Sequence, residues 1–243
     1  MRESTTDAID EWMVDWVLIS ASIFRLEKEI PLYSLSLPFP LRIEQQQPKA
    51  LRIDVELPQE DVQSELSRIY ERLYRPNDSL FDLPVVRIAD IPGLVFRYRV
   101  ADGEHYVYVE DLAEKRLAGY TVFNRLVELD RRADRYLRAP HSRYAPAYQR
   151  RGITTAIYWW WLRTNCSLIS GARQSPGAHA LWHSLARRHE MFFVELRNKE
   201  LTCLGREVDL CVQEDLHTRM IMLADGWDLR RLTKATRMKV RVA

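Results

Sequence analysis

The amino-acid sequence predicts an α/β protein of the α+β kind, built on a mixed, mostly antiparallel central sheet that is flanked by helices. Three observations lead to this fold class. A series of short strands is expected over residues 85–123, and a strand, a glycine turn and an apolar helix follow over residues 136–164. Strands and helices then alternate over residues 166–196. Additional helical segments are expected at both ends of the chain.

Composition and charge narrow the class of protein. Of the 243 residues, 47% are hydrophobic, which is enough to bury a substantial core. The formal net charge is only +2, so we expect no nucleic-acid partner. The three cysteines are an odd number and show no C-x-x-C spacing, which argues against a disulfide framework or a zinc ribbon and favours a reducing compartment.

The sequence does not predict attachment to a membrane. No apolar run approaches the length of a membrane span. The first residues include Glu3, Asp7, Asp10 and Glu11, where an ordinary secretory signal would be basic and then apolar. We therefore expect a soluble, cytoplasmic protein, although export by a route that reads no such signal is compatible with the sequence.

The chain divides into three predicted regions. Residues 1–48 combine an amphipathic helix over 6–29 with a connector rich in proline. Residues 49–200 form the central domain, and residues 201–243 form a C-terminal extension with a helix and a basic tail. The N-terminal helix either packs on the domain or binds a partner.

The first half of the central domain shows clear periodicity. Residues 51–57 alternate between apolar and polar side chains, as in a half-buried strand, and residues 59–73 show the apolar spacing of a helix. The Asp102-Gly103 pair predicts a tight hairpin turn. Further strands are expected, in chain order, over residues 85–88, 94–100, 105–110 and 117–123.

The stretch from Tyr148 to Thr155 is the leading candidate for a binding site. It follows an extended segment that ends at Pro146 and leads directly into an apolar helix. A turn with one glycine between a strand and a helix directs several backbone N–H groups to one point, where the helix dipole adds partial positive charge. Because Arg150 and Arg151 add formal charge, the pattern predicts a phosphate site.

The elements after this turn alternate between helix and strand. A short buried strand is expected over residues 166–170, a second helix begins at Ser175-Pro176, and another strand covers residues 191–196. Beyond them we expect a strand or turn over residues 201–210. A further helix is expected to carry the apolar residues Leu216, Met220, Ile221 and Leu223.

The glycine turn, in this order of elements, resembles the GCN5-related N-acetyltransferase (GNAT) superfamily. The acyl-CoA motif of that family is Gln or Arg, two residues, Gly, one residue, then Gly or Ala, placed between a strand and a helix. Residues 149–154 match this motif at Gln149 and Gly152, whereas Thr154 stands where the family has a small residue. A threonine there could crowd a pyrophosphate or donate a hydrogen bond to it.

The second helix carries another motif similar to that family, written N-x-x-A-x-x-L-Y. Ala178 and Leu181 match, while Ser175 and Trp182 replace the Asn and the Tyr. In many members that tyrosine protonates the leaving thiolate, a role that an indole N–H does not fill near neutral pH. The adjacent His183 is a candidate for the missing acid.

The resemblance implies an acyl-CoA site around the glycine turn. Amides of the turn would hold the pyrophosphate, and backbone groups of the preceding strand would meet the thioester. Ser175 either contacts CoA or only caps its helix. The residues implied to bind acetyl-CoA are Arg143, Tyr144, Ala145, Gln149, Arg150, Arg151, Gly152, Ile153, Thr154, Thr155 and Ser175.

Transfer to an ammonium substrate also needs a base. His141 has a suitable ordinary pKa and lies just upstream of the turn. Glu110 is the next candidate, followed by Glu128 and Asp130, and each of these side chains could instead have a structural role. No metal is expected, because the two histidines at positions 179 and 183 have no third ligand at a recognisable spacing.

The function that the resemblance implies is a GNAT-type N-acyltransferase, which transfers an acetyl group from acetyl-CoA to a primary amine of a small molecule or a protein. Its partners would be acetyl-CoA and the amine acceptor, with no membrane involved, and a homodimer is compatible with the sequence. The departures at Thr154 and Trp182 favour the alternative, a catalytically inactive GNAT-fold module with a binding or regulatory role. Such a protein could also be phage-associated or act as an effector.

Overall fold

The computed structural model describes residues 59–241. These residues belong to the unit Pro48–Ala243. The expected N-terminal helix, the proline-rich connector and the strand over residues 51–57 therefore lie outside the described residues.

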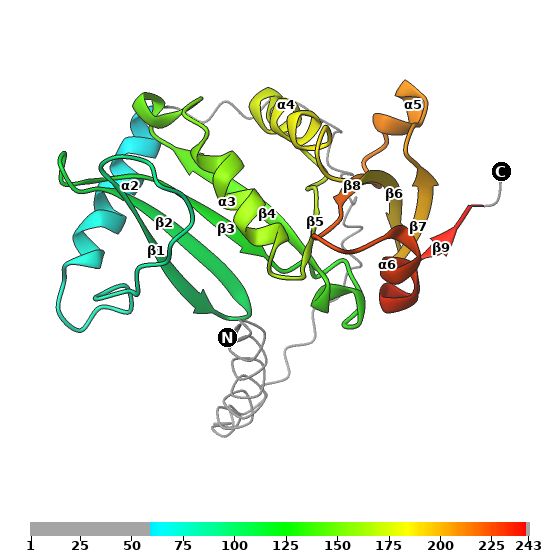
Figure 1. Ribbon diagram of the computed structural model, residues 1–243, viewed down its shortest axis with the longest axis horizontal. Coiled ribbons are helices and arrows are strands. Elements are labelled where there is room, and N and C mark those ends of the chain that lie inside the picture. Colours follow the sequence, from blue (N-terminus) through cyan, green and yellow to red (C-terminus); the bar gives the residue numbers. More distant parts are fainter. Residues whose placement is uncertain (1–58, 242–243) are drawn as a thin grey trace, which may run out of the picture. The chain divides into compact units, whose positions relative to one another are not determined.

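Strands of the described chain form a nine-stranded mixed sheet in the order β1-β2-β3-β4-β5-β8-β6-β7-β9 (Figure 1). Neighbouring strands are antiparallel except in the pairs β4–β5 and β7–β9, which are parallel. This confirms the mixed, mostly antiparallel sheet that the sequence predicts. The strands are β1 (Leu94–Ala101), β2 (Glu104–Asp111), β3 (Arg116–Asn124), β4 (Leu137–Tyr144), β5 (Ser167–Ile169), β6 (Met191–Arg197), β7 (Glu200–Gly205), β8 (Thr218–Met222) and β9 (Lys239–Val240).

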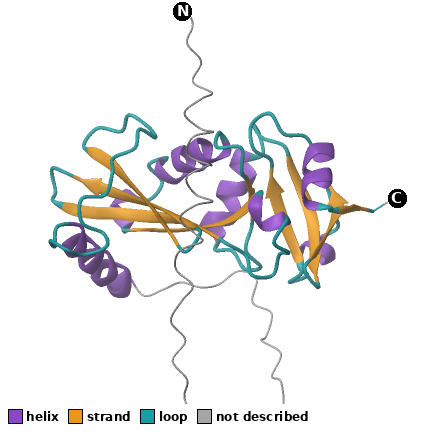
Figure 2. Cartoon of the chain, turned by 90° about the horizontal axis from the view of Figure 1, so that it is seen from below, coloured by secondary structure: helices purple, strands orange, loops and turns teal. Residues whose placement is uncertain are grey.

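Helices lie on both sides of the strands (Figure 2). Glu65 of α2 accepts a hydrogen bond from the Tyr120 hydroxyl on β3 (2.8 Å), whereas Trp161 of α3 stacks on Phe123 of the same strand, with ring centroids 4.0 Å apart. Strand residues three apart point to opposite faces, so α2 and α3 cover opposite faces. The helices are α2 (Gln59–Leu73), α3 (Ile153–Leu162), α4 (Pro176–Leu185), α5 (Leu210–Gln213) and α6 (Leu229–Thr236), with 3₁₀ turns η1 (Ala133–Arg135) and η2 (Pro146–Tyr148).

The structure confirms the predicted hairpin between β1 and β2. Asp102 and Gly103 both have positive φ, 55° and 76°, as a type I′ turn requires. Ala101 and Glu104 pair directly on either side of the turn. The turn residues thus set the register of the first two strands.

Two predictions of secondary structure are wrong. Residues 85–88 form no strand of their own within the described chain, because only Val85 makes an isolated bridge, to Arg97 of β1. Residues 216–223, expected as a helix, instead contain β8. All five residues of β8 are buried, so its apolar run lacks the alternation by which a half-buried strand is recognised.

The residues after position 200 are part of the sheet. They supply β7, β8 and β9, and β8 lies between β5 and β6. The region expected as a C-terminal extension therefore provides an internal strand, together with α5 and α6.

Strand β4 separates from β5 soon after it begins. Their parallel pairing covers only Leu137 with Ser167 and Arg138 with Leu168. On its other side, β4 stays paired with β3 over residues 139–144. The second edge of β4 is therefore not covered by any strand of the described chain from Ala139 onwards.

Buried apolar side chains form two clusters. The first cluster takes residues from β1–β4, from α2, α3 and α4, and from β5, β6 and β8, and includes Tyr144, Ile157, Trp161 and Trp182. The second cluster takes residues from β4–β8 and α6. Both motif helices, α3 and α4, therefore contribute side chains to the first cluster.

The close approach of β3 to β4 gives a test of this packing. A Cβ added at Gly119 would collide with the Tyr144 ring and lie 2.5 Å from the Arg143 carbonyl oxygen. We expect Gly119→Ala to lower the free energy of unfolding by about 1–3 kcal/mol, as overpacking does, in urea denaturation. Gly177→Ala is the control, because its Cβ meets nothing within 4 Å and alanine favours a helix. Equal losses in both variants would contradict the packing.

Candidate functional site

The glycine turn leaves the start of α3 open. Gly152 has φ 77° and directly precedes α3, and Arg150 also has positive φ, 59°. No side chain of residues 59–241 caps this helix, and a Cβ built on Gly152 meets no atom within 4 Å. The N–H groups of the first helical turn therefore face open space beside a positive dipole end, which suits an anion.

Tyr148 fastens the turn to the β2–β3 hairpin. Its hydroxyl donates to Asp111 Oδ2 (2.7 Å) and accepts from Arg116 Nε (3.0 Å). The guanidinium carbons of Arg116 and Arg151 each lie 5.3 Å from the centre of its buried ring. Arg151 therefore has a defined position beside the turn, and Tyr148 is a site-forming residue that the motif comparison did not single out.

One side chain ties the turn to the end of β4. Gln149 Nε2 donates to the Tyr144 carbonyl oxygen (3.0 Å). Gln149 thus holds the strand to the turn.

The uncovered edge of β4 presents backbone donors. Ala145 N–H donates to the Ala118 carbonyl (3.0 Å), so the odd-numbered residues of β4 direct their N–H groups to β3. Ser142 and Tyr144 consequently direct theirs to the other edge, where the pairing with β5 has already ended at Arg138. An extended ligand could pair with this edge as a strand does.

Side chains of the α2 face surround the same part of β4. Arg143 Nη1 donates to Glu65 of α2, which also accepts from Tyr120. Burial acts to raise the pKa of Glu65, but the hydrogen bonds from Arg143 and Tyr120 outweigh it and lower that pKa. Glu65 and Tyr120 were not identified from the sequence, since no motif relates positions so far apart in the chain.

His141 lies on this α2 face as well, because it alternates with Ser142 along β4. The residue is exposed, but neighbouring atoms partly desolvate its ring. This desolvation, together with the positive charge of Arg143, lowers the pKa of His141 from its ordinary value of 6.5. The ring is therefore neutral at pH 7 and able to accept a proton.

The acidic candidates have structural partners. Glu110 is 0% exposed, accepts from Arg97 Nε (2.6 Å) and accepts from the Tyr74 hydroxyl. Glu128 pairs with buried Arg219 (3.2 Å). Asp130 accepts from the backbone N–H groups of the two residues that open η1, at positions 132 and 133. These contacts account for all three carboxylates without a catalytic role.

Helix α4 carries the second motif. Ser175 Oγ accepts from the Ala178 N–H (3.2 Å), so Ser175 caps the helix. Trp182 is 3% exposed and packs in the core, whereas His183 is exposed, with its ring centroid 4.4 Å from that of His179. Among residues 59–241, no three potential metal ligands of the His, Cys, Asp and Glu types come together.

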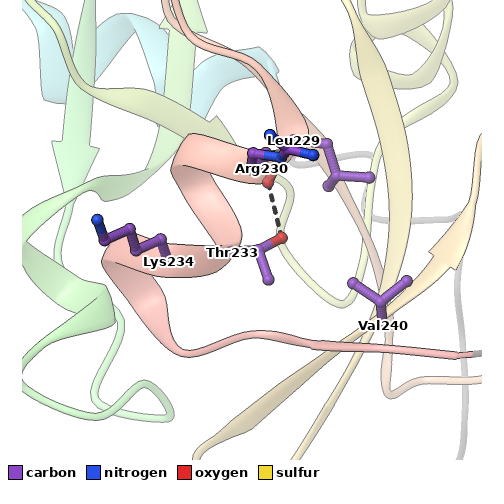
Figure 3. A pocket seen from close by; sticks show the side chains of 5 residues that line it. All are labelled: Leu229, Arg230, Thr233, Lys234 and Val240. Carbon is purple, nitrogen blue, oxygen red and sulfur yellow. Dashed lines mark hydrogen bonds between the residues drawn. The ribbon is translucent and has the colours of Figure 1, made fainter.

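A separate hollow of about 560 Å³ lies beside α6 and β9 (Figure 3). Thr233 Oγ1 donates to the Leu229 carbonyl oxygen there (2.7 Å). The hollow is lined by Leu229, Arg230, Thr233, Lys234 and Val240. These side chains offer no carboxylate or imidazole for catalysis, and β9 lies at the far edge of the sheet from β4.

The structure brings most of the expected acyl-CoA residues together. The strand end over residues 143–145 and the turn over residues 149–155 are joined by the hydrogen bond from Gln149 to the Tyr144 carbonyl, with Arg150 and Arg151 exposed. Ile153 is buried and Thr155 half-buried in the first turn of α3.

In the described part of the chain, no helix is both long and apolar enough to cross a membrane.

Comparisons with known proteins return matches among solved structures. No family model and no curated protein matches the chain. A GNAT superfamily phosphinothricin acetyltransferase from Sinorhizobium meliloti, in complex with AcCoA, is 20% identical over 51% of this chain and 63% of its own, with a TM-score of 0.32.

Two further structures belong to the same group of acetyltransferases. A chimera of spermidine N-acetyltransferase SpeG from Vibrio cholerae and hSSAT is 18% identical over 51% of this chain and 66% of its own (TM-score 0.29). A protein assigned as a phosphinothricin N-acetyltransferase is 12% identical over 70% of this chain and 96% of its own (TM-score 0.32). They are acetyltransferases of the kind that the two motifs resemble. With TM-scores this low, these structures do not assign a function to the chain.

The assignment of Glu110 to the core can be tested by stability. Glu110→Gln leaves the half-buried Arg97 without its counter-charge, so we expect the free energy of unfolding to fall by about 1–3 kcal/mol. Asp90→Asn is the control, because the Arg87–Asp90 pair (3.0 Å) is exposed and should contribute about 0–1 kcal/mol. A fully stable Glu110→Gln protein that has lost only activity would contradict the structural role.

Proposed function

We propose that this protein is a GNAT-type N-acyltransferase, which transfers an acetyl group from acetyl-CoA to a primary amine. One observation carries the proposal: β4 loses its partner β5 beyond Arg138, and the open start of α3 lies at the other end of the same strand. A donor with a charged pyrophosphate and an amide-rich pantetheine arm needs these two features side by side.

The glycine turn fits the pyrophosphate. The backbone N–H groups at the start of α3 would bind its oxygens, with Gly152 leaving the space that a side chain would fill. Arg150 and Arg151 are exposed beside these groups and would pair with the phosphate charge. Gln149 would not touch the ligand, since it holds the Tyr144 carbonyl.

The uncovered edge of β4 fits the pantetheine arm and the thioester. The amide groups of pantetheine would pair with the edge as an added strand. The N–H groups of Ser142 and Tyr144 would donate to pantetheine carbonyls and to the thioester oxygen, where negative charge develops during attack by the amine. These donors are part of the sheet, so they are held in place before the ligand binds.

His141 is the proposed base. It would remove a proton from the amine on the α2 face of β4, one residue from the Ser142 N–H. Glu65 and Tyr120 would border the amine site on that face and help to select the acceptor. The acceptor class extends to primary amines of small molecules and of proteins.

A second candidate function is an acyl-CoA-binding module without catalysis. The buried Trp182 favours it, because the motif has a tyrosine acid at that position. Calorimetry with acetyl-CoA and amide formation over a panel of primary amines, including spermidine, phosphinothricin and lysine peptides, separate the two functions. Binding without amide formation would support the module, and absence of binding would remove both.

Charge at the turn provides the first test of acetyl-CoA binding. Asp and Asn both tolerate positive φ, so Gly152→Asp and Gly152→Asn should fold with little strain. We expect Gly152→Asp to weaken acetyl-CoA binding about 100-fold through repulsion of phosphate, and Gly152→Asn to weaken it less. The measurement is calorimetric titration.

Gly93→Asp is the control for this test. Gly93 has φ 79° and equally open surroundings, but it lies in the turn before β1. Its variant should bind acetyl-CoA as the native protein does. Native affinity in Gly152→Asp would place the phosphate site elsewhere.

The pH dependence of turnover tests His141. Because its pKa lies below 6.5, the neutral ring is present at pH 7 and is lost as the pH falls through that pKa. We expect kcat/KM to decline on the acid side below pH 6.5. His141→Gln should abolish this decline and lower kcat/KM about 100-fold, while His217→Gln, an exposed histidine, should change neither. Persistence of the acid decline in His141→Gln would exclude it as the base.

A further inference from the structure

Four side chains form one row across the first four strands of the sheet, on the face that carries His141. The strand register pairs Arg99 of β1 with Tyr106 of β2. It then pairs Tyr106 with Val122 of β3, and Val122 with His141 of β4. Residues that are directly opposite in neighbouring strands point to the same face. Arg99 and the proposed base therefore stand at the two ends of this row, with an aromatic and an aliphatic side chain between them.

Helix α2 contacts the next row of the sheet. Glu65 of α2 accepts a hydrogen bond from Tyr120, which belongs to that next row. In the row of Arg99, the side chains of Arg99 and Tyr106 are half-buried and that of His141 is exposed. Three of the four side chains are thus at least partly accessible from solvent.

The charge of Arg99 is available to a ligand. Its guanidinium carbon lies 5.8 Å from the centre of the Tyr106 ring, so the side chain lies against its neighbour in the row. The carboxylate of Glu104 also meets Tyr106, but it accepts a hydrogen bond from the tyrosine hydroxyl (2.9 Å). Within residues 59–241, no carboxylate forms an ion pair with Arg99. A guanidinium has five N–H donors, which suit an anionic group.

We infer that the acceptor is a primary amine joined by an apolar spacer to an anionic group, as in an ω-amino acid. The inference rests on the proposed function. His141 would take the proton of the amine at one end of the row, and Arg99 would bind the carboxylate at the other. Tyr106 and Val122 would pack against the spacer, which explains why the middle of the row is apolar and its ends are polar.

The length of the row favours an extended acceptor. Neighbouring strands lie about 4.8 Å apart, so three strand intervals separate the Cα atoms of Arg99 and His141 by about 14 Å. In an α-amino acid, the amine and the carboxylate are attached to the same carbon, so they do not reach both ends. A chain of several carbons does, because the long side chain of Arg99 reduces the gap.

Three acceptors with the same six-carbon chain provide the measurement. 6-Aminohexanoate ends in a carboxylate, hexylamine in a methyl group and 1,6-diaminohexane in a second ammonium. We expect the native protein to acetylate 6-aminohexanoate with a kcat/KM about tenfold above that for hexylamine, as one hydrogen bond to a charged group provides. 1,6-Diaminohexane should be the poorest of the three, because Arg99 repels its second charge.

Two substitutions should change this preference in opposite directions. Arg99→Met keeps the aliphatic part of the side chain and removes the charge, so the ratio of kcat/KM between 6-aminohexanoate and hexylamine should fall about tenfold. Glu104→Gln removes the carboxylate that repels an anion beside Tyr106, so the same ratio should rise about threefold. A merely structural role of Arg99 would lower kcat/KM for all acceptors alike and leave the ratio unchanged.

Arg87→Met is the matched control. Arg87 is exposed, forms its ion pair with Asp90 (3.0 Å) and precedes β1, so it lies outside the row. This variant should keep the native ratio. A ratio that falls as much in Arg87→Met as in Arg99→Met would contradict a specific contact with Arg99.

The outcomes separate the acceptor class from the transferase itself. An unchanged ratio in Arg99→Met would overturn the inference and leave the transferase intact. A native protein that prefers hexylamine or 1,6-diaminohexane would do the same. A native protein that binds acetyl-CoA but forms no amide with these acceptors or with the wider amine panel would overturn the transferase and the inference together.

Discussion

The site depends on the hydrogen bonding of one strand. β4 is held by β3 from Ala139 to Tyr144 but by β5 only at Leu137 and Arg138. An inner strand with one free edge is costly unless something else satisfies its N–H and C=O groups. Here Gln149 satisfies one carbonyl, and the donors of Ser142 and Tyr144 remain directed outward. The proposed binding of an extended acyl donor rests on that imbalance, and the position of the glycine turn follows from where β4 ends.

The comparison of His141 with Glu110 shows why residue type alone does not assign chemistry. His141 and Glu110 are both titratable and both precede the turn in the chain. Glu110 is enclosed with Arg97 and Tyr74, so its charge is already used to stabilise the fold. His141 lies on an exposed part of β4, where partial desolvation and then the charge of Arg143 lower the pKa of its ring. Burial and partners, which no spacing rule records, separate the two.

Much of the fold could be predicted from local sequence signals. The Asp102-Gly103 turn, the alternating strands and the glycine before α3 are each determined within a few residues. β8 could not be recognised, because complete burial removes its alternation. Glu65 could not be connected with Arg143 across 78 positions, and Arg99 and His141 are unrelated residues until the sheet places them in one row. The features that could not be predicted from the sequence therefore depend on contacts between residues far apart in the chain.

The place of β8 in the sheet has a consequence for folding. β1, β2 and β3 pair with their chain neighbours, so this half can form as soon as it leaves the ribosome. β5 and β6 cannot complete their half until residues 218–222 are synthesised and inserted between them. Until then both strands expose unpaired edges, a state open to wrong association. The pairing of β8 with β5 and β6 is thus a late and non-local step of folding. Until residues 218–222 pair, the nascent protein is exposed to aggregation.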